Sequence, residues 1–294
     1  QYMHTGEGLH RFVAPADGKA YTYSQFEVPD ARRVYTTFEQ PDLKSTFTLT
    51  VKAPKGWKVF SNAPTPSPEE DGDSWTYRFA TTEKMSTYIT AVVAGPYEGV
   101  TDTLTSSDGR TIDLGVYCRA SVLEHLDADA IIDITRKGFE FFEDAYGIAY
   151  PFTKYDQVFV PEYNAGAMEN AGCVTFRDAY VCRTRPTEAQ LESRANTILH
   201  ELAHMWFGDL VTMKWWNDLW LNESFAEFMS HLALAANTPY TEGWTGFMVR
   251  KDWGLKQDQL PTTHPITAQI RDLADVEVNF DGITYAKGAS VLRQ

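Results

Sequence analysis

The chain has 294 residues, of which 43 % are hydrophobic and 22 % are charged, and its formal net charge is −14. This length favours two domains, and this composition is typical of a globular protein with a sizeable core. The acidic balance argues against nucleic acid as a partner, because nucleic-acid binding needs a basic surface.

Neither a signal peptide nor an apolar run of about 20 residues is found, so no membrane segment is expected in this chain. Three cysteines, Cys118, Cys173 and Cys182, fit no zinc-ribbon spacing. Reduced thiols in a cytoplasmic protein are the simplest interpretation, and a Cys173–Cys182 bridge across a hairpin is the alternative. Because the chain begins at Gln1 rather than methionine, the missing signal peptide is only weak support for this location.

The first hundred residues read as β structure. Short runs rich in threonine, aromatic and β-branched residues alternate with turn formers. The predicted strands cover residues 45–51, 57–61, 74–79 and 87–93. Period-two runs at this spacing predict a sandwich of antiparallel strands.

The sequence changes near residue 99 from short strand-like runs to a mixture of strand-like and helical segments. Strands are predicted at 101–104 and 112–117, followed by an amphipathic helix over 123–145, where apolar residues recur at spacings of three to five. Two further short strands, at 158–160 and 174–176, flank a glycine-containing turn.

Two longer helices complete the chain. The first is predicted over residues 187–207, with Thr187 as its N-cap, and the second over 222–236. The fold class is therefore α+β, with a β-rich domain over residues 1–99 and a helix-dominated domain over residues 100–294.

Residues 200–204 read HELAH and lie in the last turns of the first of these helices. Residues four apart differ by about 40° around a helix and about 6 Å along it, so His200 and His204 lie on one face and can bind one ion. Glu201 points partly to the same side and can reach a water on the metal. Imidazole and carboxylate ligands with an open position suit zinc, so we predict one Zn²⁺ per chain.

A catalytic zinc site needs a third protein ligand, and Glu223 is the candidate. It follows His204 after 18 intervening residues, which allows a turn and a return on the second helix. Glu223 would then lie in the first turn of that helix. A bare HELAH string on a surface helix can arise by chance, but the helical context and the following glutamate favour a metal site. His231 lies alone on the second helix and is interpreted as a packing or surface histidine.

Three further segments match a known family. Residues 166–170 read GAMEN and end 30 residues before His200, residues 280–288 read FDGITYAKG, and residues 25–27 read QFE. Together with HELAH and Glu223, these segments resemble the aminopeptidase N family, in the gluzincin branch of zinc metallopeptidases. The similarity runs through essentially the whole chain and is greatest to bacterial, actinobacterial-type members.

The resemblance implies a saddle-like β-rich N-terminal domain followed by a thermolysin-like, helix-dominated catalytic domain. Family members carry further strands before a point like Gln1, and more of the catalytic domain and a helical C-terminal domain after a point like Gln294. We therefore expect this chain to be a central piece, truncated at the C-terminal end of its catalytic domain.

The resemblance also implies roles for individual residues. Glu201 would be the general base, and Tyr285 would donate a hydrogen bond to the oxyanion of the tetrahedral intermediate. Glu169 and Glu27 would bind the α-ammonium group of a peptide. Small residues before Glu169 would offer backbone groups to the substrate. The predicted substrate-binding residues are Gln25, Glu27, Gly166, Ala167, Met168 and Glu169.

The implied activity is removal of single residues from peptides that have a free N-terminus. Epoxide hydrolysis, as in the leukotriene hydrolase relatives of the family, is one alternative; those relatives resemble glutamine at the position matched by Glu27. A non-catalytic or inactive peptide-binding fragment is the other alternative. The presence of His200, Glu201, His204, Glu223 and Tyr285 argues against loss of the chemistry.

Overall fold

The computed structural model describes residues 2–294, and the contacts within it divide the chain into two compact units. Unit 1 comprises Gln1–Glu39, Leu43–Ile132 and Pro151–Pro186, and unit 2 comprises Gln40–Asp42, Asp133–Tyr150 and Thr187–Gln294. The described strands all belong to unit 1, whereas unit 2 is built from helices and turns. The chain is thus α+β, with β-rich sequence first, as the order of strand-like and helix-like segments predicts.

The predicted domains, residues 1–99 and 100–294, are divided where the sequence pattern changes. The two units defined by contacts have different boundaries. Strand β8, Tyr97–Thr105, crosses residue 99, and the strands that follow it group with unit 1. The division at residue 99 stays a prediction about domains.

Unit 1 contains two small antiparallel sheets. The four-stranded sheet has the order β1-β2-β7-β4, formed by Gly8–Val13, Ala20–Gln25, Val92–Gly95 and Lys58–Ser61. The three-stranded sheet has the order β3-β6-β5, formed by Thr50–Pro54, Ser74–Arg78 and Glu69–Asp71.

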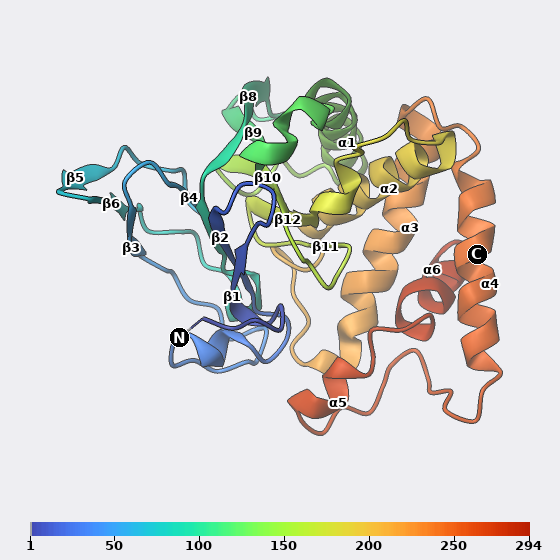
Figure 1. Cartoon of the computed structure of the whole chain (residues 1–294). Helices are drawn as coiled ribbons and strands as arrows, with labels where there is room; N and C mark the ends of the chain where they lie inside the picture. The colour runs from blue at the N-terminus through green and yellow to red at the C-terminus, as the bar shows by residue number, and fades with distance from the viewer. Residues whose placement is uncertain (1) are drawn as a thin grey trace. The chain divides into compact units, whose positions relative to one another are not determined.

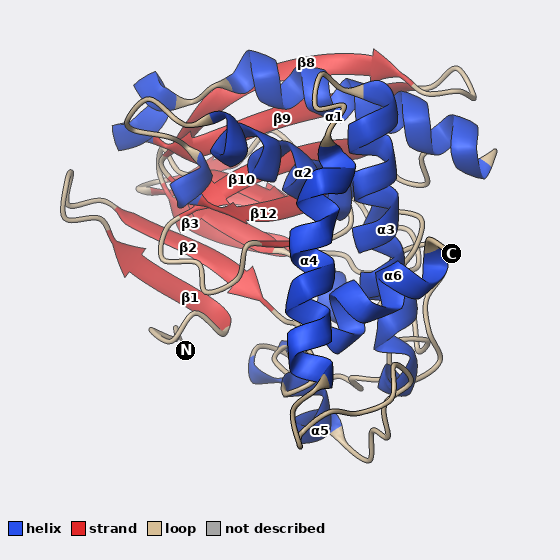
Figure 2. Cartoon of the chain, turned by 90° about the vertical axis from the view of Figure 1, so that its right-hand side faces the viewer, coloured by secondary structure: helices blue, strands red, loops and turns tan. Residues whose placement is uncertain are grey.

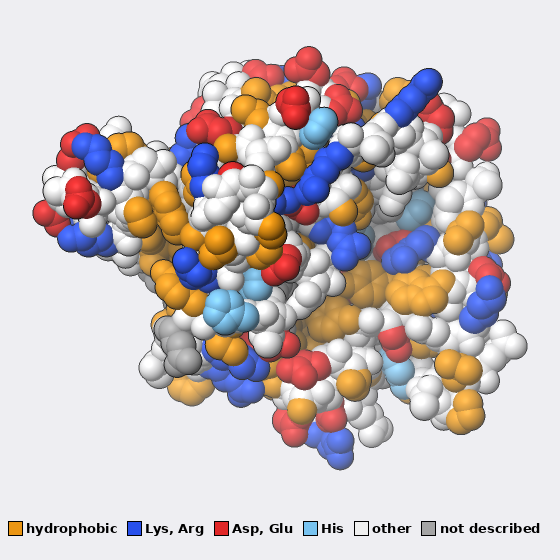
Figure 3. Space-filling view, in the orientation of Figure 1, with side chains coloured by type: hydrophobic (Ala, Val, Ile, Leu, Met, Phe, Trp, Pro, Cys, Tyr) orange, Lys and Arg blue, Asp and Glu red, His pale blue; other side chains and the backbone are white. Residues whose placement is uncertain are grey.

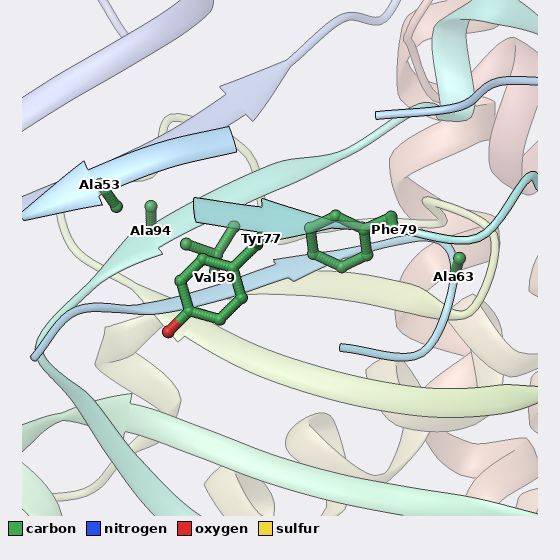
Figure 4. Close-up of a cluster of buried hydrophobic side chains, with 6 residues drawn as sticks. All are labelled: Ala53, Val59, Ala63, Tyr77, Phe79 and Ala94. Atoms are coloured by element: carbon green, nitrogen blue, oxygen red, sulfur yellow. The ribbon is translucent and has the colours of Figure 1, made fainter. Parts of the chain in front are cut away.

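A cluster of buried side chains joins these two sheets (Figure 4). Ala53 of β3 and Tyr77 of β6 meet Val59 of β4 and Ala94 of β7, and Phe79 extends the cluster beyond β6. Full burial of an apolar side chain of valine or phenylalanine size contributes about 1.5–3 kcal/mol to stability. This packing confirms the predicted antiparallel sandwich in the first hundred residues.

The β5–β6 hairpin, at the left of Figure 3, carries acidic and basic side chains close together. Its edge strand β5 has only three residues, all of them acidic and exposed. Short, charged edge strands oppose pairing with another chain, so this edge is protected against aggregation.

The third sheet of unit 1 has five strands in the order β11-β12-β10-β9-β8 (Figure 1). Besides β8, it contains β9, β10, β11 and β12, which are Thr111–Arg119, Lys154–Val160, Ala167–Met168 and Cys173–Arg177. Strand β10 is buried at every residue and runs parallel to both β9 and β12. Burial on both faces is typical of a central parallel strand. Strands β11 and β8 form the two edges of the sheet.

Several predicted strands are confirmed and two need correction. The run at 45–51 overlaps β3 only at its end, and its first part is extended chain with a single bridge between Ser45 and Met85. The run at 87–93 splits into a 3₁₀ turn, Thr87–Ile89, and β7. All three turn residues are buried, so their aromatic and β-branched character reflects burial rather than strand pairing.

Unit 2 is helical. Its helices are α2 to α6, formed by Glu188–His204, Leu219–Asn237, Gly243–Asp258, Leu273–Glu277 and Gly288–Leu292. Helix α1, Ala128–Tyr146, follows a 3₁₀ turn at Ala120–His125, so the helix predicted over 123–145 begins five residues later than expected. In both views α6 lies between α3 and α4 (Figures 1 and 2).

The start of α2 is fixed by a capping box. The Thr187 side chain accepts a hydrogen bond from the Gln190 backbone, and the Gln190 side chain accepts one from the Thr187 backbone at 2.8 Å. Such a cap contributes about 1 kcal/mol. The predicted N-cap is therefore confirmed, although α2 ends at His204, three residues earlier than predicted.

Large aromatic side chains pack where α2 ends. Trp206 is 1 % exposed, its indole nitrogen donates to the Ile148 carbonyl at 3.0 Å, and it contacts the rings of Phe139 and Phe142. Trp216 is equally buried. Core packing is thus confirmed for these two tryptophans.

The three cysteines are free thiols. Burial is the main influence on two of them and raises the pKa of Cys118 to about 12 and that of Cys173 to about 11. Both therefore stay protonated at neutral pH. Across residues 2–294, the helices fall short of the length and apolarity that crossing a membrane requires.

Candidate metal centre and substrate-binding residues

Helices α2 and α3 of unit 2 bring the three predicted metal ligands together. The Nε2 atoms of His200 and His204 lie 3.0 Å apart. The Oε2 atom of Glu223 lies 3.3 Å from the first of these nitrogens and 3.5 Å from the second. All three side chains are at most 11 % exposed.

These distances fit a single tetrahedral ion. Zinc bonds to imidazole nitrogen and carboxylate oxygen are about 2.0–2.1 Å long, so two ligands of a tetrahedral ion stand about 3.3–3.4 Å apart. The three separations of 3.0, 3.3 and 3.5 Å bracket this value. Two imidazoles and one carboxylate facing one another at this spacing form a donor set suited to a divalent cation.

Glu223 lies in the second turn of α3 rather than the first, because α3 begins at Leu219 instead of residue 222. Burial pushes the pKa of Glu223 upward, but hydrogen bonds and charge from His200 and His204 outweigh burial and hold the pKa below its ordinary value. The carboxylate is therefore ionised at neutral pH, as a metal ligand must be.

The His204 imidazole is oriented by the chain that follows α2. Nδ1 of His204 donates to the carbonyl of Phe207 at 3.1 Å, so the ring proton is on Nδ1 and the Nε2 lone pair is the one that can bind a metal. Gly208 has φ +132, and a Cβ there would come within 2.2 Å of the Asn222 side-chain oxygen. Only glycine allows the chain to pass so close to His204 and to the start of α3.

Glu201 lies on α2 beside the ligands. It is 5 % exposed, and one of its carboxylate oxygens lies within 4.8 Å of a ring nitrogen of His204. This is the position the helical spacing predicts for a base that acts on a metal-bound water.

Tyr285 belongs to unit 2 and lies beside the metal ligand His200. Its ring stacks on that of His200, with centroids 6.1 Å apart and planes at 20°. It sits in a π-helical turn, Ile283–Lys287, an irregularity that is frequent at functional sites. Helix α4 approaches this turn closely because Gly254 has no side chain; a Cβ there would meet the Gly282 carbonyl at 2.8 Å.

The turn that carries Tyr285 is anchored at both ends. One Asp281 carboxylate oxygen accepts from the backbone of Ile283 and Thr284, both at 3.0 Å, and the other lies 2.8 Å from Nε2 of His264. At the far end Lys287 pairs with Asp258 at 2.7 Å. Sequence reasoning assigned no role to His264, and the structure makes it a support for this turn.

Two further charged residues next to the metal ligands were missed by the sequence analysis. Glu227 is 2 % exposed and forms two hydrogen bonds with Arg250, at 2.7 and 3.0 Å. Burial pushes the pKa of Glu227 up, but Arg250 outweighs burial and holds the pKa below its ordinary value. The i,i+4 spacing from Glu223 was the signal that could have found Glu227. His231 is buried and packs here, as predicted.

The predicted substrate-binding residues lie in unit 1. Gly166 precedes the edge strand β11, which consists of Ala167 and Met168, and Glu169 follows it. Glu169 is 3 % exposed, and one of its carboxylate oxygens lies within 4.8 Å of a carboxylate oxygen of Glu27. Two carboxyl groups this close together offer several acceptor oxygens to one cationic group.

Gln25, the last residue of β2, joins this group through a hydrogen-bond network. Its amide nitrogen faces the Met168 sulfur at 3.5 Å, and its amide oxygen accepts from the Tyr163 hydroxyl. The Thr175 hydroxyl donates to Tyr163 at 3.2 Å and accepts from the Asn170 amide at 3.2 Å. The network fixes Gln25 relative to β11 and β12; nothing in the sequence pattern pointed to Tyr163.

A metal site on an HELAH helix, completed by a glutamate from the next helix, is the centre of a metallopeptidase. Residues 131–294 match the Peptidase family M1 domain, and residues 6–89 match the Peptidase M1 N-terminal domain. The chain belongs to the M1 family of peptidases, which are metallopeptidases.

Relatives of this chain carry aminopeptidase names. Aminopeptidase N of Streptomyces lividans is 60 % identical over 296 residues, which cover 100 % of this chain and 34 % of that protein. Leucyl aminopeptidase of Saccharolobus solfataricus is 40 % identical, covering 92 % of this chain and 34 % of that protein. Aminopeptidase M1 of Arabidopsis thaliana is 36 % identical, covering 98 % and 32 %. The chain spans about a third of the length of these relatives, and the similarity to the first confirms the resemblance to actinobacterial-type members.

Proposed function

We propose that this chain carries the centre of a zinc aminopeptidase, which removes single residues from the N-terminus of peptides. The convergence of the His200, His204 and Glu223 ligand atoms within 3.5 Å of one another carries the proposal. The aminopeptidase names of the M1 relatives support the exopeptidase class.

Zinc is the metal that best suits this donor set. Two imidazoles and one carboxylate, with room for a fourth ligand, are typical of catalytic zinc. The carboxylate-rich, oxygen-only sets preferred by calcium and magnesium differ from it. Zinc, when bound, would supply a water of lowered pKa and polarise the scissile carbonyl.

The protein's own groups perform the proton transfers in this proposal. Glu201 takes a proton from the attacking water and passes it to the leaving amine. Glu201 is 5 % exposed, so bulk water has little access to its carboxylate. The Tyr285 hydroxyl donates a hydrogen bond to the oxyanion that develops on the substrate carbonyl.

Tyr285→Phe should lower kcat by about 100-fold and change KM little, since the hydroxyl acts mainly in the transition state. Steady-state kinetics on an aminoacyl amide measure both constants. Tyr240→Phe, which removes a hydroxyl elsewhere in unit 2, is the matched control and should retain full activity. A raised KM with unchanged kcat would make Tyr285 a binding residue.

Recognition of the peptide N-terminus falls to the acidic residues of unit 1 in this proposal. Glu169 and Glu27 bind the α-ammonium group through charge-assisted hydrogen bonds, and Gln25 is a neighbouring polar contact. Gly166, Ala167 and Met168 offer backbone groups to the peptide. The edge position of β11 in its sheet supports this role, because an edge strand can pair with an extended peptide.

The proposal is tested by removing and restoring the metal. Treatment with a chelator should abolish hydrolysis of an aminoacyl chromogenic amide, and one equivalent of Zn²⁺ should restore it. Turnover that persists in metal-free protein would reject a metallopeptidase. A zinc-loaded protein that binds peptides without turnover would favour the non-catalytic alternative. The cytoplasmic location stays a prediction, to be tested by cell fractionation.

A further inference from the structure

The outer nitrogen of a metal-binding imidazole usually has an acceptor. A histidine that binds through Nε2 carries its proton on Nδ1, and an acceptor there fixes the tautomer and the ring orientation and raises ligand basicity. His204 has this partner in the Phe207 carbonyl. For His200, the Glu227 carboxylate occupies the corresponding place, with Oε2 3.9 Å from Nδ1.

Helix geometry places Glu227 there. It follows Glu223 by four residues in α3, so the two carboxylates lie one turn apart on the same face. Oε2 of Glu223 lies 3.3 Å from Nε2 of His200, and Oε2 of Glu227 lies near Nδ1 on the other side of the same ring. A separation of 3.9 Å exceeds a hydrogen bond, so the contact is electrostatic, and burial keeps solvent from screening it.

Arg250 of α4 holds the Glu227 carboxylate in place. Its Nε and Nη2 atoms donate to the two carboxylate oxygens at 2.7 and 3.0 Å, a planar bidentate arrangement. The guanidinium also lies 4.5 Å from the centre of the Trp253 ring. His231 also contacts Glu227, but its Nδ1 donates to the backbone carbonyl at 2.8 Å. The hydrogen bonds to the two carboxylate oxygens are those from Arg250.

A purely structural role explains this pair less well. A buried ion pair contributes little net stability compared with an apolar pair of similar volume, so joining α3 to α4 does not require a carboxylate here. A carboxylate beside a dication site is stabilised by the cation, which an apolar side chain would not be. We infer that Glu227, anchored by Arg250, is a positioning residue for the metal ligand His200 and accepts its Nδ1–H when the metal is bound.

The inference rests on the proposed zinc site and is tested by zinc affinity rather than by activity. Glu227→Gln preserves size and removes the charge. Its zinc dissociation constant, measured by competition with a chromogenic chelator, should rise about 10- to 100-fold. The Co²⁺-substituted variant should show a shifted visible spectrum, because the basicity and orientation of one ligand change.

Glu143→Gln is the matched control. Glu143 is also a buried carboxylate of unit 2 and accepts from the Tyr150 backbone at 2.7 Å, so this variant loses a buried charge away from His200. It should keep the parental zinc affinity and Co²⁺ spectrum. Equal weakening in both variants, or parental affinity in Glu227→Gln, overturns the inference.

A second variant covers failure of Glu227→Gln to fold. Arg250→Lys keeps the positive charge but loses the bidentate geometry, so it should weaken zinc binding by a smaller factor; unchanged affinity would again overturn the inference. If the unmodified protein binds no zinc, the proposed function fails as well. If it binds zinc tightly and both variants match it, only the role of Glu227 is lost.

Discussion

His204→Ala should leave the purified protein without stoichiometric zinc and without peptidase activity. The imidazole is one of three protein ligands, and its Nε2 lies 3.0 Å from that of His200. Substitution of a residue that only orients a metal ligand typically weakens metal affinity about 10- to 100-fold. Loss of a ligand itself should therefore weaken zinc affinity by more than about 100-fold. Elemental analysis after gel filtration measures the metal directly.

A second histidine serves as the control for this substitution. His125 lies in the 3₁₀ turn at Ala120–His125, and its side chain is 34 % exposed. His125→Ala should retain zinc and activity. Full zinc occupancy in His204→Ala would remove His204 from the ligand set and with it the proposed metal centre.

Glu201→Gln should retain zinc and lose about 10²- to 10⁴-fold in kcat. The amide has the size of the carboxylate but cannot accept a proton, which is the contribution usually found for a general base. Because Glu201 is not one of the three converging ligands, the metal should stay bound. Elemental analysis and steady-state kinetics on the same sample separate the two effects.

Glu188→Gln tests whether any charge loss on α2 has this effect. Glu188 is exposed in the first turn of the same helix, three turns before the metal ligands. Its variant should match the parent in zinc content and turnover. Near-normal turnover by Glu201→Gln would show that another group takes the proton.

The sequence predicted those parts of the site that depend on local spacing. The helical period places His200 and His204 on one face, Thr187 caps their helix, and the gap of 18 residues returns the chain as α3. Local rules cannot fix the ends of helices, because fraying and tertiary contacts decide them. This is why Glu223 lies one turn deeper in α3 than predicted.

Contacts between distant segments were beyond the sequence analysis. Arg250 reaches Glu227 from another helix, 23 residues away, and Tyr163 reaches Gln25 across 138 residues. Neither pair leaves a periodic or compositional signal. The parallel pairing of β10 with β9 and β12 is equally nonlocal. The strands β1 and β2 were also missed.

The role of Glu169 provides the most direct test of exopeptidase action. The zinc ligands, base and tyrosine would act on any peptide bond presented to them, whereas the Glu169 and Glu27 carboxylates should demand a cationic α-ammonium group. Only a free α-ammonium group can form charge-assisted hydrogen bonds with these carboxylates. Glu169→Gln should therefore retain zinc and lose most activity on a free-amine peptide, chiefly through a raised KM.

The decisive measurement is mass spectrometry of the products from one peptide in two forms, with a free N-terminus and with an N-acetyl group. Acetylation removes the positive charge and adds bulk where the substrate amine would bind. The account predicts that the free peptide shortens one residue at a time from its N-terminus, while the acetylated peptide stays intact. Internal cleavage of the acetylated peptide by the zinc-loaded protein would contradict an aminopeptidase and leave only a zinc endopeptidase.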